Sequence, residues 1–207
     1  MTAEKAPRLG ILVSGRGSNM EAILQAAALG RLGATPVLVV SDNPQAPALA
    51  KAAQRGVAIA VVRRRDYASA SEFERALVAE LKGAGVDLVA LAGFMRVLGR
   101  EFLAAFPGRV LNIHPSLLPS FPGLHAQRQA LEYGVRVSGC TVHFVDEQVD
   151  HGPIVLQAAV PVLPADTEET LSARILAEEH RIYPEAIRLV AEGRVRVEGR
   201  RVWILDR

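Results

Sequence analysis

The chain has 207 residues, half of them hydrophobic and 22% charged, a composition that predicts a folded protein with a substantial core rather than a disordered one. Its 24 lysines and arginines and 22 aspartates and glutamates give a formal net charge of +2, too small to indicate a nucleic-acid partner. The length predicts a single domain, residues 1–207.

Cysteine use and hydropathy indicate the compartment. Cys140 is the single cysteine of the chain, so the sequence offers no disulfide and predicts a reducing, cytoplasmic location. It lies in an apolar run, where we expect an inert core residue. The sequence has neither a run of 18 apolar residues nor a signal-peptide core before the first strand, and it therefore predicts neither a membrane span nor secretion.

A glycine-rich turn follows the first predicted strand. Residues 8–13 are apolar, as in a buried parallel strand, and residues 20–28 carry an apolar stripe typical of a helix. Between them lies Ser-Gly-Arg-Gly-Ser-Asn, residues 14–19. Such turns bind phosphate through the free N–H groups at the helix start, which makes this one a candidate phosphate loop. The alternative is a tight turn in which Ser18 or Asn19 caps the helix.

Strands and helices then alternate along the first half of the chain. Further strands are predicted at residues 34–41, 57–62, 86–91 and 109–113, and helices at residues 46–54, 67–82 and 99–106. This alternation predicts an α/β fold with a doubly wound, mainly parallel, Rossmann-like sheet.

Two segments at predicted strand ends allow a structural and a functional interpretation. Arg63–Arg65 is either a solvated turn or a site facing an acidic ligand. Residues 94–98, Phe-Met-Arg-Val-Leu, either pack into the core or line a flat apolar pocket for an aromatic ligand.

The fifth strand ends in Asn112-Ile113-His114-Pro115. Alternation along a strand places Asn112 and His114 on the same face, and Pro115 ends the strand because it has no N–H for the ladder. An amide and an imidazole at the carboxyl end of a buried strand are typical of an α/β active site. A satisfied polar pair without a function is the alternative.

The second half departs from this pattern. A helix is predicted at residues 126–133, followed by strands at residues 135–145 and 154–160 that add to the sheet edge in antiparallel fashion. Asp150 lies on the loop between these strands, where an ordinary solvated carboxylate is the alternative to a functional one. Asp166 and Glu169 fit a capping box for a long helix that ends near residue 191, and residues 194–198 and 201–205 form a terminal hairpin.

Four motifs together resemble those of one family. They are Gly15-Arg16-Gly17-Ser18-Asn19, Leu91-Ala92-Gly93-Phe94-Met95-Arg96, Asn112-Ile113-His114-Pro115-Ser116-Leu117-Leu118-Pro119 and Asp150-His151-Gly152-Pro153. In order and spacing they resemble the folate-dependent formyltransferases over essentially the whole chain. The resemblance implies transfer of a formyl group from the co-substrate 10-formyltetrahydrofolate to the amine of glycinamide ribonucleotide, in purine synthesis.

The resemblance also implies roles for individual residues. The catalytic residues would be Asn112, His114 and Asp150. The residues that bind glycinamide ribonucleotide would be Gly15, Arg16, Gly17, Ser18, Asn19 and Glu179. The folate-binding residues would be Met95, Arg96, Val97, Leu98, Asn112, Asp146, Glu147, Gln148, Val149 and Asp150. Residues 1–110 would then form a phosphate-binding half and residues 111–207 a catalytic and folate-binding half. The Leu118-Pro119 bond is expected to be cis.

Two positions depart from the family pattern. Arg16 stands where relatives often have asparagine, and a cation there still suits a phosphate. Ala70 stands near a position where some relatives have an arginine that holds the glutamate tail of the folate. Arg63–Arg65 or Arg75 are the candidates to replace it.

The implied chemistry suits these residue types. Attack of the amine on the formyl carbon gives a tetrahedral intermediate, whose negative oxygen Asn112 and protonated His114 can stabilise. His114 is the candidate general acid, and Asp150 would orient it and favour its charged form. The five histidines lack the close spacing of metal ligands, so we expect no metal. We expect small-molecule substrates, neither nucleic acid nor a membrane as partner, and a monomer or a homodimer.

Three alternatives use the same pocket. A methionyl-tRNA formyltransferase resembles a longer chain with a tRNA-binding domain, and a formyltetrahydrofolate hydrolase usually carries an additional N-terminal domain. The length and near-neutral charge of this chain favour neither. A non-catalytic folate or phosphate binder would keep the pocket without turnover.

Overall fold

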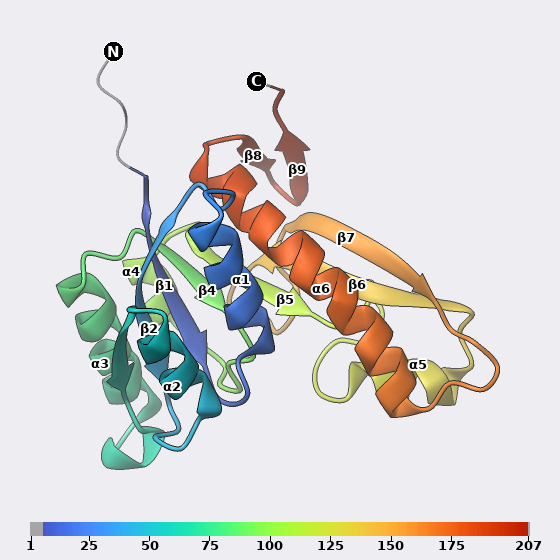
Figure 1. Cartoon of the computed structure of the whole chain (residues 1–207), viewed down its shortest axis with the longest axis horizontal. Helices are drawn as coiled ribbons and strands as arrows, with labels where there is room; N and C mark the ends of the chain where they lie inside the picture. The colour runs from blue at the N-terminus through green and yellow to red at the C-terminus, as the bar shows by residue number, and fades with distance from the viewer. Residues whose placement is uncertain (1–5, 207) are drawn as a thin grey trace.

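The computed structural model describes residues 6–206, which form a seven-stranded sheet, flanking helices and a separate two-stranded hairpin (Figure 1). The strands are β1 Arg8–Val13, β2 Thr35–Ser41, β3 Ala58–Val61, β4 Leu88–Leu91, β5 Val110–His114, β6 Val137–Phe144, β7 Ile154–Pro161, β8 Val195–Glu198 and β9 Arg201–Ile204. The helices are α1 Ser18–Ala28, α2 Pro47–Gln54, the short 3₁₀ helix Arg64–Asp66, α3 Ala70–Gly83, α4 Arg100–Ala105, α5 Ala126–Tyr133 and α6 Glu168–Ala191.

The main sheet confirms the predicted doubly wound architecture. Its strand order is β3-β2-β1-β4-β5-β6-β7, and the pairs from β3 to β5 are parallel. β6 and β7 extend it as antiparallel strands, as predicted. The order reverses direction between β1 and β4, and ligands of open α/β sheets bind outside the carboxyl ends of the strands at such a point.

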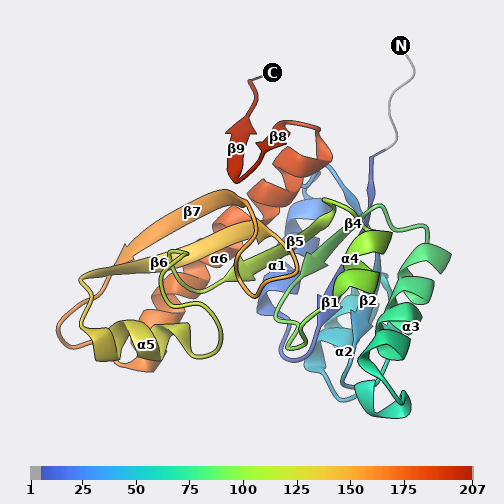
Figure 2. The same cartoon turned by 180° about the vertical axis from the view of Figure 1, so that it is seen from behind.

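Helices cover both faces of the sheet and bury two apolar clusters. One cluster joins the sheet to α1, α2, α5 and α6, and the other joins it to α3 and α4. Figure 1 shows α1 and α6 in front of the sheet, and Figure 2 shows α3 and α4 on the opposite side. The strands of the parallel part are apolar on both sides because both of their faces are covered.

α6 is tied to the middle of the sheet by one buried hydroxyl. Tyr183 is fully buried, and its Oη lies 3.0 Å from the carbonyl oxygen of Leu91 and 2.9 Å from that of Leu111. Leu91 is the last residue of β4 and Leu111 is the second residue of β5, so the hydroxyl links α6 to two neighbouring strands. Burial raises the pKa of Tyr183 well above its ordinary value, so the hydroxyl stays a donor.

Several predicted helix starts were wrong. α1 starts after Gly17, which is in the left-handed conformation at φ 75°, so neither Ser18 nor Asn19 is its N-cap. α3 starts at Ala70, after an N-cap at Ser69. The capping box of α6 is formed by Thr167 and Thr170, not by Asp166 and Glu169.

Asp166 has different partners from those predicted. Arg174 donates two hydrogen bonds to its carboxylate, of 2.7 and 2.8 Å, and the Leu163 N–H donates another of 2.7 Å. These contacts hold the pKa of Asp166 well below its usual range. The Thr170 hydroxyl also donates to Asp166 at 2.8 Å, so the carboxylate contacts a residue of the capping box but is not itself the cap of α6.

Cys140 and the terminal hairpin agree with prediction. Cys140 is fully buried and free, and burial raises the pKa of its thiol to about 12, so it is a weak nucleophile at neutral pH. β8 and β9 form the antiparallel hairpin. Among the residues that the structure describes, every helix is too short or too polar to cross a lipid bilayer.

Glu74 fixes the start of α4 from a neighbouring helix. It is buried on α3, and its carboxylate accepts hydrogen bonds from the N–H groups of Gly99 at 2.9 Å and Phe102 at 3.3 Å. These N–H groups lie at the start of α4, where the helix leaves them without internal partners. Glu74 thus anchors the chain just after residues 94–98.

We expect Glu74→Ala to lower the free energy of unfolding by about 2–3 kcal/mol, since it leaves two buried N–H groups without an acceptor. Urea denaturation measures the change. Glu80→Ala, at an exposed site on the same helix, is the matched control and should change it by less than about 0.5 kcal/mol. Equal effects of the two variants would contradict the capping role.

Candidate active site

Asn112 and His114 lie near the carboxyl end of β5. This strand is flanked by parallel β4 and antiparallel β6, so its last residues are at the junction of the parallel and antiparallel parts of the sheet. Asn112 is partly buried and His114 is 5% exposed. Both point to the same side, as their spacing predicted.

The loop between β6 and β7 brings Asp150 to these two residues. The Asp150 Oδ2 atom lies 3.2 Å from Nδ1 of His114, and Oδ1 accepts a long hydrogen bond of 3.5 Å from Nδ2 of Asn112. The Gly123 N–H donates to Oδ2 at 2.8 Å. Asp150 has a left-handed backbone, with φ 51°, and its side chain is only 10% exposed. The three predicted catalytic residues therefore meet in one cluster, and Asp150 is not a solvated turn carboxylate.

His114 has an acceptor at each ring nitrogen. Nδ1 faces the Asp150 carboxylate, and Nε2 lies 2.8 Å from the carbonyl oxygen of Phe121. Only the doubly protonated ring can donate to both. Phe121 is in the loop that follows Pro119, and its backbone is left-handed, with φ 53°. The Leu118-Pro119 bond is cis, as predicted.

His143 completes the cluster, and the sequence interpretation missed it. It lies opposite Asn112 in the β5–β6 register and is 2% exposed. Its Nδ1 lies 2.8 Å from the Phe144 carbonyl oxygen and its Nε2 lies 3.3 Å from Nδ2 of Asn112. Nδ1 therefore carries the proton, and Nε2 accepts from the amide. The sequence did show a histidine in a predicted buried strand. Only the β5–β6 register, however, reveals that this histidine lies opposite Asn112.

The electrostatics of His143 support this tautomer. Burial lowers its pKa, although the hydrogen bond to Phe144 and the charge of Asp150 oppose the shift. A neutral ring keeps the Nε2 lone pair that holds the Asn112 amide in place. His143 thus orients Asn112.

The candidate phosphate loop lies at the carboxyl end of β1. Its Gly17 is in the left-handed region, and a Cβ built there would lie 2.6 Å from Cβ of Ala48, so a side chain has no room. Ser14 Oγ accepts a hydrogen bond of 2.9 Å from the Met95 N–H, which joins this loop to residues 94–98. Arg16 is exposed.

Glu179 reaches the same loop from α6. It is 7% exposed, and Asn19 Nδ2 donates to its Oε2 at 2.7 Å. Burial raises the pKa of Glu179, and the bond from Asn19 opposes the shift. The structure therefore brings together residues 19 and 179, both predicted to bind one substrate.

Residues 94–98 divide between core and surface. Phe94 and Leu98 are buried in the apolar cluster under α3 and α4, whereas Met95 and Val97 are 65% and 73% exposed. Phe94 and Leu98 therefore fit the core interpretation, whereas Met95 and Val97 present apolar side chains at the surface.

A cleft of about 520 Å³ opens beside Met95 and Arg96. Its other walls are residues 42–45 and Arg63–Arg65. Arg96 Nε donates to Asp42 at 2.7 Å. The cleft therefore has the apolar side chain of Met95 and several arginines in its walls. The cluster of Asn112, His114 and Asp150 does not line it.

The loop of residues 146–150 is largely exposed. Glu147 pairs with Arg100 at 3.0 Å, and Gln148 and Val149 extend into solvent. Asp146 accepts from the Gln148 N–H at 2.9 Å. Within residues 6–206, histidines, cysteines and carboxylates are nowhere grouped in the threes needed to hold a metal ion.

Comparison with known proteins gives consistent matches. The sequence profile of a family described as formyl transferase matches residues 7–187. The chain is 42% identical over 194 residues to phosphoribosylglycinamide formyltransferase of Escherichia coli (strain K12), covering 94% of this chain and 92% of that protein.

A second relative is much longer. The chain is 47% identical to the trifunctional purine biosynthetic protein adenosine-3 of Drosophila melanogaster over 93% of its own length but only 14% of that protein, so it spans about a seventh of this relative. Among solved structures, glycinamide ribonucleotide transformylase 1 from Symbiobacterium toebii is 55% identical with a TM-score of 0.97, and all of both chains is covered.

The lowered pKa of His143 predicts a loss of stability in acid. The unfolded chain binds a proton near pH 6.5 that the folded chain takes up only at lower pH, so stability falls as the pH drops below about 6.5. His143→Gln, with no titratable ring, should lose less stability between pH 7 and pH 5 in urea denaturation. His125→Gln, at an exposed site, is the control. An unchanged pH slope in His143→Gln would contradict the assignment.

Proposed function

The chain belongs to the formyl transferase family, and from that membership we propose that it transfers the formyl group of 10-formyltetrahydrofolate to the amine of glycinamide ribonucleotide in purine biosynthesis. The observation that carries the proposal is the convergence of Asn112, His114 and Asp150 in one cluster at the carboxyl end of β5. The names of the matched relatives support glycinamide ribonucleotide as the acceptor of the formyl group.

The glycine-rich loop is proposed to bind the phosphate of the ribonucleotide. Gly15 and Gly17 let the backbone approach an anion, and the helix α1 begins immediately after them. Arg16, exposed on the loop, adds a positive charge. Glu179 and Asn19 would contact the sugar or the glycinamide, because Glu179 reaches from α6 to Asn19 at the end of this loop.

Asn112 is proposed to donate to the oxygen of the tetrahedral intermediate. When the substrate amine attacks the formyl carbon, the carbonyl oxygen becomes negative and needs a fixed donor. One Nδ2 hydrogen of Asn112 is directed to His143. The contact of the second to Asp150 is long, at 3.5 Å, which leaves that hydrogen available for the oxyanion.

His114 is proposed to be the general acid, assisted by Asp150. The reaction requires a proton to leave the attacking amine and another to reach the folate nitrogen as the carbon–nitrogen bond to the folate breaks. Because Asp150 occupies Nδ1, the nitrogen available for this work is Nε2. Nε2 is bonded to the Phe121 carbonyl, so the substrates must displace Phe121 for His114 to act.

The folate is proposed to bind between residues 95–98 and residues 146–150. Met95 and Val97 would pack on its ring because they are exposed apolar side chains next to the cleft. Arg63–Arg65 line the same cleft and are proposed to bind the glutamate tail of the folate. They would replace the arginine that some relatives have near the position of Ala70. Arg75 is the weaker candidate, since it pairs with Glu101 at 3.4 Å.

One assay with three acceptors tests the activity. The protein is incubated with 10-formyltetrahydrofolate and glycinamide ribonucleotide, initiator tRNA or water alone, and loss of the formyl group is followed. We expect turnover with glycinamide ribonucleotide only. Faster turnover with tRNA or with water would replace the proposal by a tRNA formyltransferase or a hydrolase, and a lack of turnover would indicate a binding protein.

In the same assay we expect Asp150→Asn to lower kcat by on the order of 10²–10⁴, because His114 loses the carboxylate that orients it. Asp87→Asn is the matched control, since it makes the same change just before β4, at the amino ends of the parallel strands and away from the site. An Asp150→Asn enzyme as active as the control would contradict the assigned role.

Gly15→Ala tests the phosphate loop. A Cβ at Gly15 would meet no protein atom within 4 Å among the described residues, so the variant should fold normally while its methyl group obstructs the anion. We expect the KM for glycinamide ribonucleotide to rise about tenfold, or ~1.4 kcal/mol of lost binding. Gly83→Ala, equally unhindered but on α3, should leave KM unchanged. The same KM in both variants would count against phosphate binding here.

A further inference from the structure

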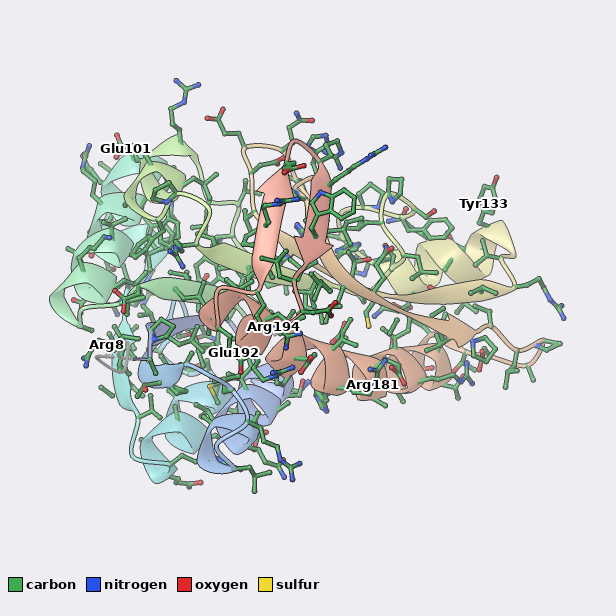
Figure 3. The ribbon with its side chains drawn as sticks, turned by 90° about the horizontal axis from the view of Figure 1, so that it is seen from above. Arg8, Glu101, Tyr133, Arg181, Glu192 and Arg194 are labelled. Atoms are coloured by element: carbon green, nitrogen blue, oxygen red, sulfur yellow. The ribbon has the colours of Figure 1, made fainter. Side chains whose placement is uncertain are left out.

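The loop that carries Asp150 is contacted by a distant part of the chain. The hairpin of β8 and β9 follows α6, and Figure 3 shows Glu192 and Arg194 at the junction of the helix and the hairpin. β9 packs against β7, the edge strand of the main sheet. At the turn of the hairpin, Arg200 extends to His151, the residue that directly follows Asp150.

Arg200 makes two kinds of contact with His151. Its Nη2 donates to the His151 backbone carbonyl at 2.7 Å. Its Nη1 lies 3.0 Å from Nε2 and 3.3 Å from Nδ1 of the ring. A guanidinium can hold a carbonyl and a ring at once because its donors are fixed in one plane.

His151 connects Arg200 to a further residue of the loop, Asp146. Its Nδ1 donates to Asp146 Oδ2 at 2.7 Å, which leaves Nε2 as the acceptor for Arg200. Burial alone would raise the pKa of Asp146, but the bonds from His151 and the Gln148 N–H and the charge of Arg200 hold it below its ordinary value. Asp146 is therefore an ionised partner of His151. Through His151, the contacts extend from Arg200 of the hairpin to Asp146, the first residue of the loop.

The backbone at Asp150 needs such support. Its left-handed φ of 51° is unusual for a residue other than glycine, and the loop residues before it are exposed. Two residues after Asp150, Gly152 lies so close to the Phe144 carbonyl that a side chain would not fit. The loop is thus fixed at Gly152 by close packing and at Asp146 and His151 by polar contacts.

We propose that Arg200 is a positioning residue for Asp150: from the terminal hairpin it holds the His151 carbonyl and ring, and so keeps the Asp150 carboxylate against His114. Arg200 acts through the loop and touches none of the catalytic side chains named above. The catalytic part of this inference rests on the proposed function, whereas the clamp on the loop does not.

Two measurements on Arg200→Ala test the proposal, with Arg201→Ala, an exposed arginine of the same hairpin, as the matched control. Amide hydrogen exchange is followed for residues 146–152, and kcat and both KM values are determined for formyl transfer. We expect faster exchange in this loop and a fall of kcat by on the order of tenfold in Arg200→Ala, with the KM for glycinamide ribonucleotide unchanged. Arg200→Gln, which keeps a donor without the charge, is a second variant should the alanine variant fold poorly.

A double-mutant cycle separates positioning from a general structural effect. If Arg200 acts through Asp150, Arg200→Ala should cause no further loss of kcat in the Asp150→Asn background. An equal tenfold loss in that background, unchanged loop exchange, or a kcat equal to that of Arg201→Ala would overturn the proposal. A wild-type protein without formyl transfer would refute the proposed function, and loop exchange alone would then decide whether Arg200 holds the loop.

Discussion

The buried carboxylate of Asp150 is the interaction on which the site depends. Three separate segments meet at it: β5 through Asn112 and His114, the 121–123 loop through the Gly123 N–H, and its own loop between β6 and β7. A charge taken out of water is tolerated only where partners surround it. The same contacts that make its burial possible therefore bring the three predicted catalytic residues together.

The proposed sites of the two substrates adjoin each other at the carboxyl ends of the parallel strands. Glu179 contacts Asn19 at the end of the glycine-rich loop, and Ser14 of the same loop lines the cleft with Met95 and Arg63–Arg65. Ser14 joins them, because its hydroxyl accepts from the Met95 N–H. The proposed phosphate and folate sites thus share one hydrogen-bonded support. His114, bonded to Phe121, is the part that must change partner on binding.

Local sequence patterns predicted the sheet and most element boundaries, because alternation, glycine turns and strand-ending prolines act over short distances. The grouping of Asp150 with Asn112 and His114 was expected from the family resemblance and not from such patterns. Interactions between distant segments were missed. His143 is opposite Asn112 only through the β5–β6 register, and Glu74 caps α4 from another helix. Asp166 was expected to cap α6, but its carboxylate pairs with Arg174, eight positions further along the chain. Arg200 belongs to the same class, since the contact with His151 spans 49 positions.

A crystal structure of the protein with glycinamide ribonucleotide and a folate that cannot transfer its formyl group tests the central claim most directly. The account predicts the phosphate on the N–H groups of residues 15–19, the amine and the formyl carbon beside Asn112 and His114, and His114 Nε2 released from the Phe121 carbonyl while Asp150 stays on Nδ1. Substrates bound away from this cluster, or a His114 still bonded to Phe121 with both of them in place, would contradict it.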